Sequence, residues 1–250
     1  MTWEAFAVQE KGAICEVVLQ TDRIGVAMVN ELERLSEYLE DESPASVLVL
    51  RGRNGRFTHG IDLGDFSLRR PPDVHGFNRW ERALRGLEQV RKVTVAVLEG
   101  ACRGGGVQLA LVCDYRLATP DAVLCLDEVK NGFLPGLATW RLSRHVGLGL
   151  ARELVLGCRE VEAARGAQYG LVSEVCSADE LERTIERVAT SFMPVNGTVV
   201  ALARRLLDES FATPYEDFLG SFLAAQHRAI SGETFMRRLQ EEALRPPPRP

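Results

Sequence analysis

The strongest constraint on the fold comes from two short apolar runs that each end in a glycine. VLVLRG covers residues 47–52 and VTVAVLEG covers residues 93–100. Neither run shows the regular polar alternation of a half-exposed strand, so both predict strands buried on two faces, as in a parallel sheet. Residues 28–43 and 73–92 carry apolar side chains at helical spacing. Strands that alternate with helices predict an α/β fold.

The two ends of the chain differ from this central pattern. Residues 6–12 and 14–21 are β-branched or alternating runs on either side of a Lys-Gly turn, which predicts a β-hairpin. Toward the C-terminal end only helical spacing is found. We therefore expect an α/β core over residues 1–195 and a helical segment over residues 196–250. The proline-rich tail, residues 246–250, is predicted to be disordered.

Composition excludes several classes of protein. A formal net charge of −5 argues against a nucleic-acid partner, because such partners need a basic surface. No apolar segment reaches the roughly 18–20 residues that span a bilayer, so no membrane partner is expected. The six cysteines lie in apolar surroundings without a CxxC pair. This predicts buried free thiols in a reduced compartment, the cytoplasm, and neither disulfides nor a metal site.

Three consecutive glycines stand between a predicted strand and a predicted helix, in GACRGGGVQLALVCDYRLA, residues 100–118. A helix that starts here leaves backbone N–H groups free at its first turn, and Gly104, Gly105 and Gly106 would let a ligand oxygen approach them. Such a site suits a phosphate or an oxyanion. The Lys-Ser/Thr pair of a P-loop is absent, which weakens the phosphate interpretation. A tight turn with close helix–strand packing explains the glycines equally well.

A second loop that is also rich in glycine favours the interpretation of the three glycines as part of an oxyanion site. RFTHGIDLGDF, residues 56–66, follows the strand at 47–52 and places Gly60 between His59 and Ile61. Two loops that each offer a backbone N–H can hold one carbonyl oxygen from two sides. That is the physical requirement of an oxyanion hole for an enolate.

The chain resembles the crotonase, or enoyl-CoA hydratase/isomerase, superfamily from about residue 10 to residue 180. Four segments carry the resemblance in family order: FTHGIDL, VTVAVLEGACRGGGVQLALVCDYRLA, LDEVKNGFLPGLATWRLSRHVG and EAARGAQYGLVSEV. The resemblance implies an α/β fold, a crotonase-like spiral of ββα repeats with a C-terminal helical segment for active-site capping or oligomerisation. It also implies a homotrimer or hexamer. The substrate would be an acyl thioester on coenzyme A or on the phosphopantetheine arm of a carrier protein, with no further cofactor.

By position, the resemblance assigns the oxyanion donors to the backbone N–H groups of Ile61 and Gly105. Further residues are expected to contact substrate: His59, Gly60, Asp62, Gly104 and Gly106 beside the two loops, Trp140 at the acyl chain, Arg69 in the following loop, and Ala27 near the adenine-ribose region. For His59 and Trp140, a role in pocket shape or core packing remains an alternative.

The sequence departs from the superfamily's hydratases at one of two catalytic positions. Those enzymes use two glutamates, and here the first position is Gln108 while the second is Glu128. A glutamine exchanges no proton at neutral pH, although it can position water or substrate. A single carboxylate can still move a proton from the α-carbon to the γ-carbon of a thioester, as the family's isomerases do. We therefore expect an enoyl-thioester isomerase or hydratase with Glu128 as the acid/base.

Three alternatives remain open. One is a decarboxylase or dehydratase of a 3-methylglutaconyl-type thioester, in polyketide or other secondary metabolism, with Arg69 or Arg70 as a carboxylate clamp and His227 near the site. Another is a member that binds an acyl thioester without catalysis. In the third, Glu128 is only a surface carboxylate paired with Lys130.

Overall fold

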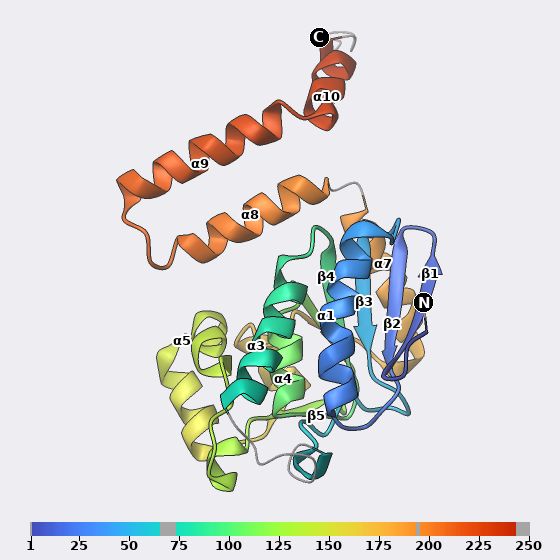
Figure 1. The fold of residues 1–250 in the computed structure, drawn as a ribbon, viewed down its shortest axis with the longest axis vertical. Helices are drawn as coiled ribbons and strands as arrows, with labels where there is room; N and C mark the ends of the chain where they lie inside the picture. Colours follow the sequence, from blue (N-terminus) through green and yellow to red (C-terminus); the bar gives the residue numbers. More distant parts are fainter. Residues whose placement is uncertain (1, 66–73, 194–195, 244–250) are drawn as a thin grey trace. The chain divides into compact units, whose positions relative to one another are not determined.

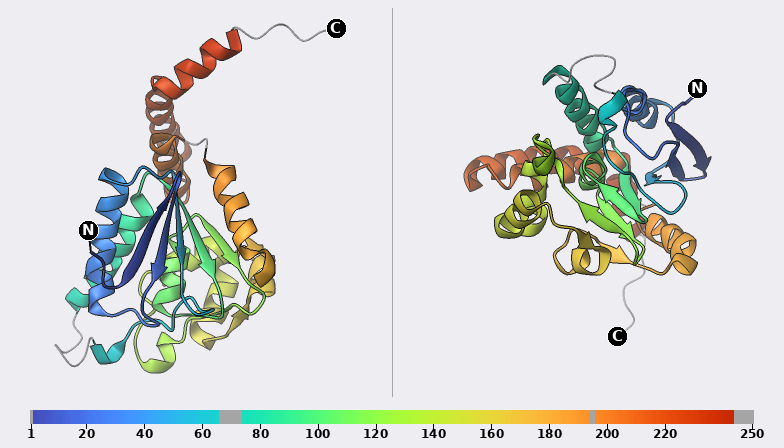
Figure 2. Two further views of the ribbon diagram at one scale, coloured as in Figure 1. Left: turned by 90° about the vertical axis from the view of Figure 1, so that its right-hand side faces the viewer. Right: turned by 90° about the horizontal axis from the view of Figure 1, so that it is seen from below.

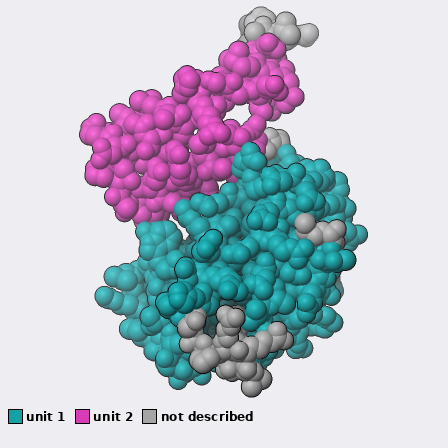
Figure 3. Space-filling model, viewed as in Figure 1, with its two compact units in different colours: residues 1–193 teal, residues 194–250 magenta. Residues whose placement is uncertain are grey.

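The computed structural model describes residues 2–65, 74–193 and 196–243. The chain divides into two compact units, residues 1–193 and residues 194–250, which are coloured separately in Figure 3. Within the described residues, no helix is both long enough and apolar enough to cross a membrane. The predicted disordered tail, residues 246–250, and the candidate Arg69 lie outside the described residues.

The first unit is built on a six-stranded sheet with the order β1-β2-β3-β4-β6-β9 (Figure 1). The strands are β1 (Phe6–Lys11), β2 (Ile14–Leu19), β3 (Val47–Arg51), β4 (Val93–Leu98), β6 (Tyr115–Ala118) and β9 (Glu174–Val175). The first two form the predicted antiparallel hairpin, and every later neighbour is parallel. The α/β class expected from the two apolar runs is confirmed.

Both apolar runs are buried on two faces because the sheet is covered on both sides. In β3, Leu48 and Leu50 face one apolar core while Val47 and Val49 face the other, as the two-residue period of a strand requires. The helices α1 (Val26–Asp41) and α3 (Val74–Gln89) cover the first face, and α7 (Leu181–Phe192) covers the second (Figure 2). The predicted helices at 28–43 and 73–92 are confirmed.

A second, three-stranded sheet carries the segments that matter for function. Its order is β5-β7-β8, formed by β5 (Ala101–Arg103), β7 (Val123–Cys125) and β8 (Val161–Glu162). β5 leads directly into α4 (Gly105–Leu111), and β7 leads into the 3₁₀ helix η1 (Glu128–Asn131). The helices α5 (Ala138–Gly157) and α6 (Ala163–Gln168) complete this region. The short strand β5, inside the glycine-rich stretch, was not predicted from the sequence.

The second unit is helical, as expected for the C-terminal segment. It contains α8 (Gly197–Glu209), α9 (Tyr215–Ile230) and α10 (Glu233–Ala243). Asn196 begins α8 as an N-cap, because its side-chain oxygen accepts hydrogen bonds from the backbone N–H groups of Thr198 and Val199. Large apolar side chains remain exposed on these helices, among them Leu219, Phe222 and Leu223 on α9.

The six cysteines are all buried and free. Burial raises the pKa of the Cys15 thiol to about 12 and also raises the pKa of Cys102. Both thiols therefore stay protonated at neutral pH and pack as small apolar groups. The predicted buried thiols are confirmed, and the cytoplasmic location stays a prediction.

Candidate active site

Two loops that are far apart in sequence are joined by a short ladder of backbone hydrogen bonds. Thr58 forms a parallel bridge with Cys102 in β5. The backbone N–H of Thr58 donates to the carbonyl of Ala101 at 2.9 Å, and the N–H of Arg103 donates to the carbonyl of Thr58 at 3.0 Å. This pairing places the 58–64 loop against the start of α4.

The glycines in these loops allow the two backbones to touch. Gly60 has φ +86°, and a Cβ added there would lie 2.9 Å from the carbonyl oxygen of Arg103. Gly104 has φ +51°, and its added Cβ would lie 3.9 Å from the Cα of Gly60 and 3.0 Å from a carboxylate oxygen of Glu128. Any side chain at either position would meet strain and close contacts.

The next glycine faces the other predicted oxyanion donor. A Cβ added at Gly105 would lie 3.1 Å from the side chain of Ile61. Gly105 begins α4, so its N–H has no partner within the helix. In the part of the chain that the structure describes, neither this N–H nor that of Ile61 donates a hydrogen bond. Both residues line the same cavity, and the shared oxyanion that they are predicted to bind stays a prediction.

Glu128 lies beside Gly104 and is nearly inaccessible, with 3% of its surface exposed. Neither of its carboxylate oxygens has a hydrogen-bond partner among the described residues. Burial is the main cause that raises the pKa of Glu128. Its own backbone N–H acts in the opposite direction, and the negative charge of Asp127 raises the pKa further. No ion pair joins it to Lys130 within the described ranges. A buried, unpartnered carboxyl group is unusual and indicates a functional role.

These elements enclose a cavity of about 490 Å³. Its lining includes Gly60, Ile61, Gly104, Gly105 and Glu128, together with His59, Asp62, Leu63, Gly64, Arg23, Arg103, Asp127, Asn131 and Phe133. The two proposed donors and the proposed base therefore share one cavity. Its walls combine the apolar side chains of Ile61, Leu63 and Phe133 with a larger set of polar and charged groups.

A second hollow, of about 1,100 Å³, adjoins the first. Its lining includes Ala27, and Arg23, His59 and Asp62 line both hollows. The predicted substrate contacts Ala27 and His59 thus line one continuous surface that is formed by the two adjoining hollows. A long ligand could extend from the carboxylate of Glu128 to the start of α1.

Gln108 and Gly106 do not line the cavity itself. Gln108 is buried, with 2% of its surface exposed. Its side-chain oxygen accepts a hydrogen bond from the indole N–H of Trp80 at 3.1 Å. Gly106 packs against Thr58, and this close packing of α4 on the loop explains why a glycine stands at position 106. Of the three glycines, Gly104 and Gly105 face the cavity and Gly106 does not.

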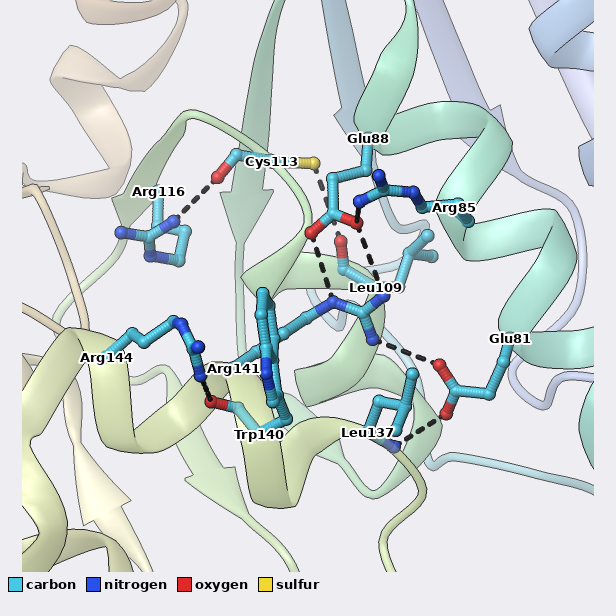
Figure 4. A network of polar contacts seen from close by, with 10 residues as sticks. All are labelled: Glu81, Arg85, Glu88, Leu109, Cys113, Arg116, Leu137, Trp140, Arg141 and Arg144. Atoms are coloured by element: carbon cyan, nitrogen blue, oxygen red, sulfur yellow. Dashed lines mark hydrogen bonds and ion pairs between the residues drawn. The ribbon is translucent and has the colours of Figure 1, made fainter. Parts of the chain in front are cut away.

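Trp140 does not line the cavity that contains Glu128, and its predicted place at the acyl chain stays a prediction. It lies on α5 and is 41% exposed, with the guanidinium of Arg144 stacked 3.4 Å from the centre of its ring (Figure 4). The helix places it on an outward face, a fact that the local sequence does not reveal. His227, in the alternative reaction, belongs to the second compact unit.

An ion-pair network supports the segment that follows the 3₁₀ helix η1. Arg141, which is buried, contacts Glu81 at 3.1 Å and Glu88 at 3.2 Å. Glu81 also accepts a hydrogen bond from the backbone N–H of Leu137 at 2.7 Å. Figure 4 shows how these side chains connect α3 to the beginning of α5. The network fixes residues 136–137 next to Gln108.

Sequence reasoning missed Arg103 and Phe133 as residues of the cavity and Trp80 as the partner of Gln108, whereas Asp127 was expected to raise the proton affinity of Glu128. Trp80 stands at an apolar position of an amphipathic helix, where its spacing indicates only core packing. Arg103 carried a weak signal, because it is adjacent to a residue that had been singled out. It forms an ion pair with Asp127 at 3.5 Å.

Comparisons with known proteins agree with this geometry. Residues 9–237 match the enoyl-CoA hydratase/isomerase family. An enoyl-CoA hydratase of Amycolatopsis orientalis is 32% identical over 224 residues, which cover 87% of this chain and 97% of that protein.

Solved structures show the same fold. An enoyl-CoA hydratase subunit from Geobacillus kaustophilus HTA426 superimposes with a TM-score of 0.88 at 22% identity, covering 99% of this chain and 98% of its own. A protein from Thermobifida fusca YX, solved in complex with acetoacetyl-CoA, gives a TM-score of 0.80 at 23% identity and covers 91% of this chain and 95% of its own. The predicted crotonase-like fold with C-terminal helices is confirmed. The chain belongs to the enoyl-CoA hydratase/isomerase family.

Proposed function

We propose that this protein is an enoyl-CoA isomerase that moves a double bond through a thioester enolate, with Glu128 as its only acid/base. The observation that carries the proposal is the buried, unpartnered carboxylate of Glu128 in the same cavity as the free N–H groups of Ile61 and Gly105. The raised pKa of Glu128 suits a group that must both accept and return a proton near neutral pH.

The proposed reaction needs one proton and no added water. The carboxylate of Glu128 takes a proton from the α-carbon of a 3-enoyl thioester, and the released electron pair forms the enolate. The N–H groups of Ile61 and Gly105 stabilise the negative oxygen. The enolate oxygen then re-forms the carbonyl, and the electron pair at the α-carbon becomes the α,β double bond. The pair of the former β,γ double bond takes the proton that Glu128 delivers to the γ-carbon. The product is the 2-enoyl thioester, and Glu128 is again ionised.

Hydration is the second candidate, and the relatives favour it. The protein from Amycolatopsis orientalis is an enoyl-CoA hydratase by name. In this reaction, water adds to the β-carbon of a 2-enoyl thioester and a proton adds to the α-carbon. Gln108 can hold a water molecule by hydrogen bonding but supplies no proton. Glu128 would therefore have to serve both steps.

A panel of thioesters in deuterated water tests these assignments. The panel holds 2-enoyl, 3-enoyl and 3-methylglutaconyl thioesters, each on coenzyme A and on a phosphopantetheine arm, with mass spectrometry as the readout. Deuterium at the α- or γ-carbon without a gain of water is the expected result. Gain of water would establish hydration instead, and loss of CO₂ would establish the decarboxylase. If every substrate binds but returns unchanged, the protein is an acyl-thioester-binding member.

Coenzyme A is the proposed carrier. The Thermobifida fusca structure of the same fold holds acetoacetyl-CoA, and the adjoining hollow that contains Ala27 gives room for a long carrier arm. A carrier protein is the alternative. The two carriers are distinguished by comparing kcat/KM for the same thioester on coenzyme A and on the phosphopantetheine arm. We propose no nucleic acid or membrane as a partner.

The exposed apolar side chains of α9 support a homotrimer or hexamer. Leu219, Phe222 and Leu223 are all exposed in the single chain, and Leu219 is a surface neighbour of the other two on the helix, three and four residues away. A patch of this kind is commonly buried between subunits. The double substitution F222E/L223E is expected to shift the protein from an oligomer to a monomer in light scattering coupled to size exclusion. A wild-type protein that is itself monomeric would refute this assignment.

A further inference from the structure

The helix α1 receives its N-terminal cap from a distant segment of the chain. Its own N-cap position is Gly25, which has no side chain to accept a hydrogen bond, and its first turn is entirely apolar. The N–H groups of a first helical turn need an acceptor, and a negative charge is stabilising at this end of a helix. The backbone N–H of Val26 donates to the carboxylate of Asp65 at 2.8 Å. Asp65 therefore caps a helix that begins 39 residues before it in the sequence.

The glycine at position 25 makes room for this carboxylate. A Cβ added at Gly25 would lie 2.7 Å from the same oxygen of Asp65 that accepts the hydrogen bond. Gly25 has φ −94°, a backbone conformation that other residues adopt without strain. The space that Asp65 occupies, and not the backbone, therefore excludes a side chain at position 25.

Asp65 lies at the end of a short turn that starts directly after Ile61. The side-chain oxygen of Asp62 accepts hydrogen bonds from the N–H of Gly64 at 3.0 Å and from the N–H of Asp65 at 3.2 Å. Asp62 thus caps the helical turn at residues 63–65. Because this turn is held by its own hydrogen bonds, a displacement of Asp65 is passed on to Asp62 and to the peptide of Ile61.

The peptide of Ile61 has a fixed direction. Ile61 forms a parallel bridge with Ile24, the residue before Gly25. The N–H of Ile24 donates to the carbonyl of Gly60 at 2.9 Å, and the N–H of Asp62 donates to the carbonyl of Ile24 at 3.0 Å. In such a bridge the neighbours of a residue bond to the partner strand, while its own N–H and C=O point to the opposite side. The N–H of Ile61 is thus turned away from Ile24, toward the side on which β5 lies.

We propose that Asp65 is a positioning residue, which anchors this loop to the start of α1 and thereby holds the N–H of Ile61 in place for the substrate oxygen. The inference rests on the proposed function, because it concerns one of the two oxyanion donors. The bridge to Ile24 sets the direction of the N–H, and the anchor at Asp65 limits how far the loop can move from α1. Asp65 acts through the backbone and exchanges no proton with the substrate.

A set of variants separates this role from a general loss of structure. Asp65→Ala removes the carboxylate, whereas Asp65→Asn keeps an oxygen that can accept the N–H of Val26. Gly25→Ala keeps Asp65 in the chain but displaces its carboxylate by the added methyl group. Asn196→Ala is the matched control, because it removes a helix cap from α8 in the second compact unit. Loss of either cap is expected to lower Tm by about 2–4 °C.

The first measurement follows the N–H of Ile61 in the free protein. Isoleucine labelled with ¹⁵N gives a small set of amide signals in NMR, and the signal that Ile61→Val removes is assigned to Ile61. In Asp65→Ala and Gly25→Ala this signal is expected to move and its {¹H}–¹⁵N NOE to fall, because the loop gains motion. The signal of Ile185, on α7 at the other face of the sheet, is expected to stay unchanged.

The second measurement reads the hydrogen bonds that reach the thioester oxygen. Butyryl-CoA labelled with ¹³C at the carbonyl carbon has no double bond to move, and donors at its oxygen shift the carbonyl resonance downfield. Asp65→Ala and Gly25→Ala are expected to keep about half or less of the shift that the wild type causes. Val26 and Asp65 also line the second hollow, so Kd is measured separately and is expected to change less than about threefold.

Kinetics give a third readout. In Asp65→Ala and Gly25→Ala, kcat for deuterium exchange is expected to fall about 10-fold, because one of the two proposed donors is displaced. Asp65→Asn is expected to restore both the carbonyl shift and kcat to within about twofold of the wild type, since it lacks only the charge. Asn196→Ala is expected to lower Tm without changing either value.

Each outcome supports or overturns the inference. A folded Asp65→Ala protein whose Ile61 signal and carbonyl shift match the wild type would overturn it, and so would equal changes in Asn196→Ala. Loss of affinity for butyryl-CoA with an unchanged carbonyl shift would make Asp65 a ligand contact instead. If Asp65→Ala does not fold, Gly25→Ala decides by the same readouts. If the wild type exchanges no deuterium, the proposed function fails, while the Ile61 signal of the free protein still tests the role of Asp65.

Discussion

Glu128→Gln is expected to abolish most of the proton exchange catalysed by the protein, with a fall in kcat of about 10²- to 10⁴-fold. The substitution keeps the shape of the side chain and removes the carboxylate that lies against Gly104 in the cavity. Substrate binding should change little, because the proposed donors Ile61 and Gly105 are backbone groups. The measurement is deuterium incorporation from the solvent, with affinity determined separately by calorimetry.

The control for this result is Glu160→Gln. Glu160 is an exposed carboxylate that pairs with Arg103 on the outside of the site. Its loss should leave the exchange rate within about threefold of the wild type, because an exposed ion pair contributes little. Full activity in Glu128→Gln would exclude Glu128 as the acid/base and leave binding without this catalysis as the better interpretation.

Glu128→Gln is also expected to be more stable than the wild type above pH 5. The pKa of Glu128 is raised in the folded protein, so the native state retains a proton that the unfolded chain has already released. Stability then falls as the pH rises from the ordinary glutamate pKa, about 4.3, through the folded value. Glu128→Gln removes this loss. Unfolding by urea at pH 4 and at pH 8 should show a gain only at the higher pH.

Gly104→Ala is expected to lower both stability and activity. Gly104 has φ +51°, and the added methyl group would lie 3.0 Å from the carboxylate of Glu128. Backbone strain of this kind destabilises by about 1–3 kcal/mol. The contact also displaces the acid/base, and a shift of about 1 Å at a catalytic group can lower the rate about 10²-fold. Urea unfolding and the deuterium exchange rate measure the two effects.

Gly12→Ala provides the matched comparison. Gly12 also has positive φ, +64°, but an added Cβ there has no atom within 4 Å. It should lose stability, by about 1–2 kcal/mol, and keep full activity. If Gly104→Ala behaves like Gly12→Ala, with an unchanged exchange rate, the close contact between Gly104 and Glu128 has no part in catalysis.

Several parts of the fold followed from local sequence. Residues 47–50 and 93–98 carry no charged side chain, and such runs have a stable place only inside a sheet that is covered on both faces. The hairpin at the start of the chain followed from its turn and its two β-branched runs. These elements depend on residues close together in the chain, so their patterns are visible without any tertiary contact.

The candidate site was only partly visible in the sequence. Gly104, Gly105 and Glu128 were found because a glycine turn before a helix and a family motif mark their positions. The strand β5 was missed, because its three residues form a strand only by pairing with distant partners such as Thr58 and β7. Short strands have too little local preference to be recognised without these partners.

The sequence by itself determined that buried strands alternate with helices and that one glutamate is kept where hydratases have two. Only the tertiary structure decided which side chains meet. It placed Trp140 on an exposed surface and Trp80 against Gln108, although both are tryptophans on helices. The reason is physical: helical spacing fixes which residues share a face, but the packing of distant segments decides what that face contacts. The orientation of the buried Gln108 amide depends on such a contact.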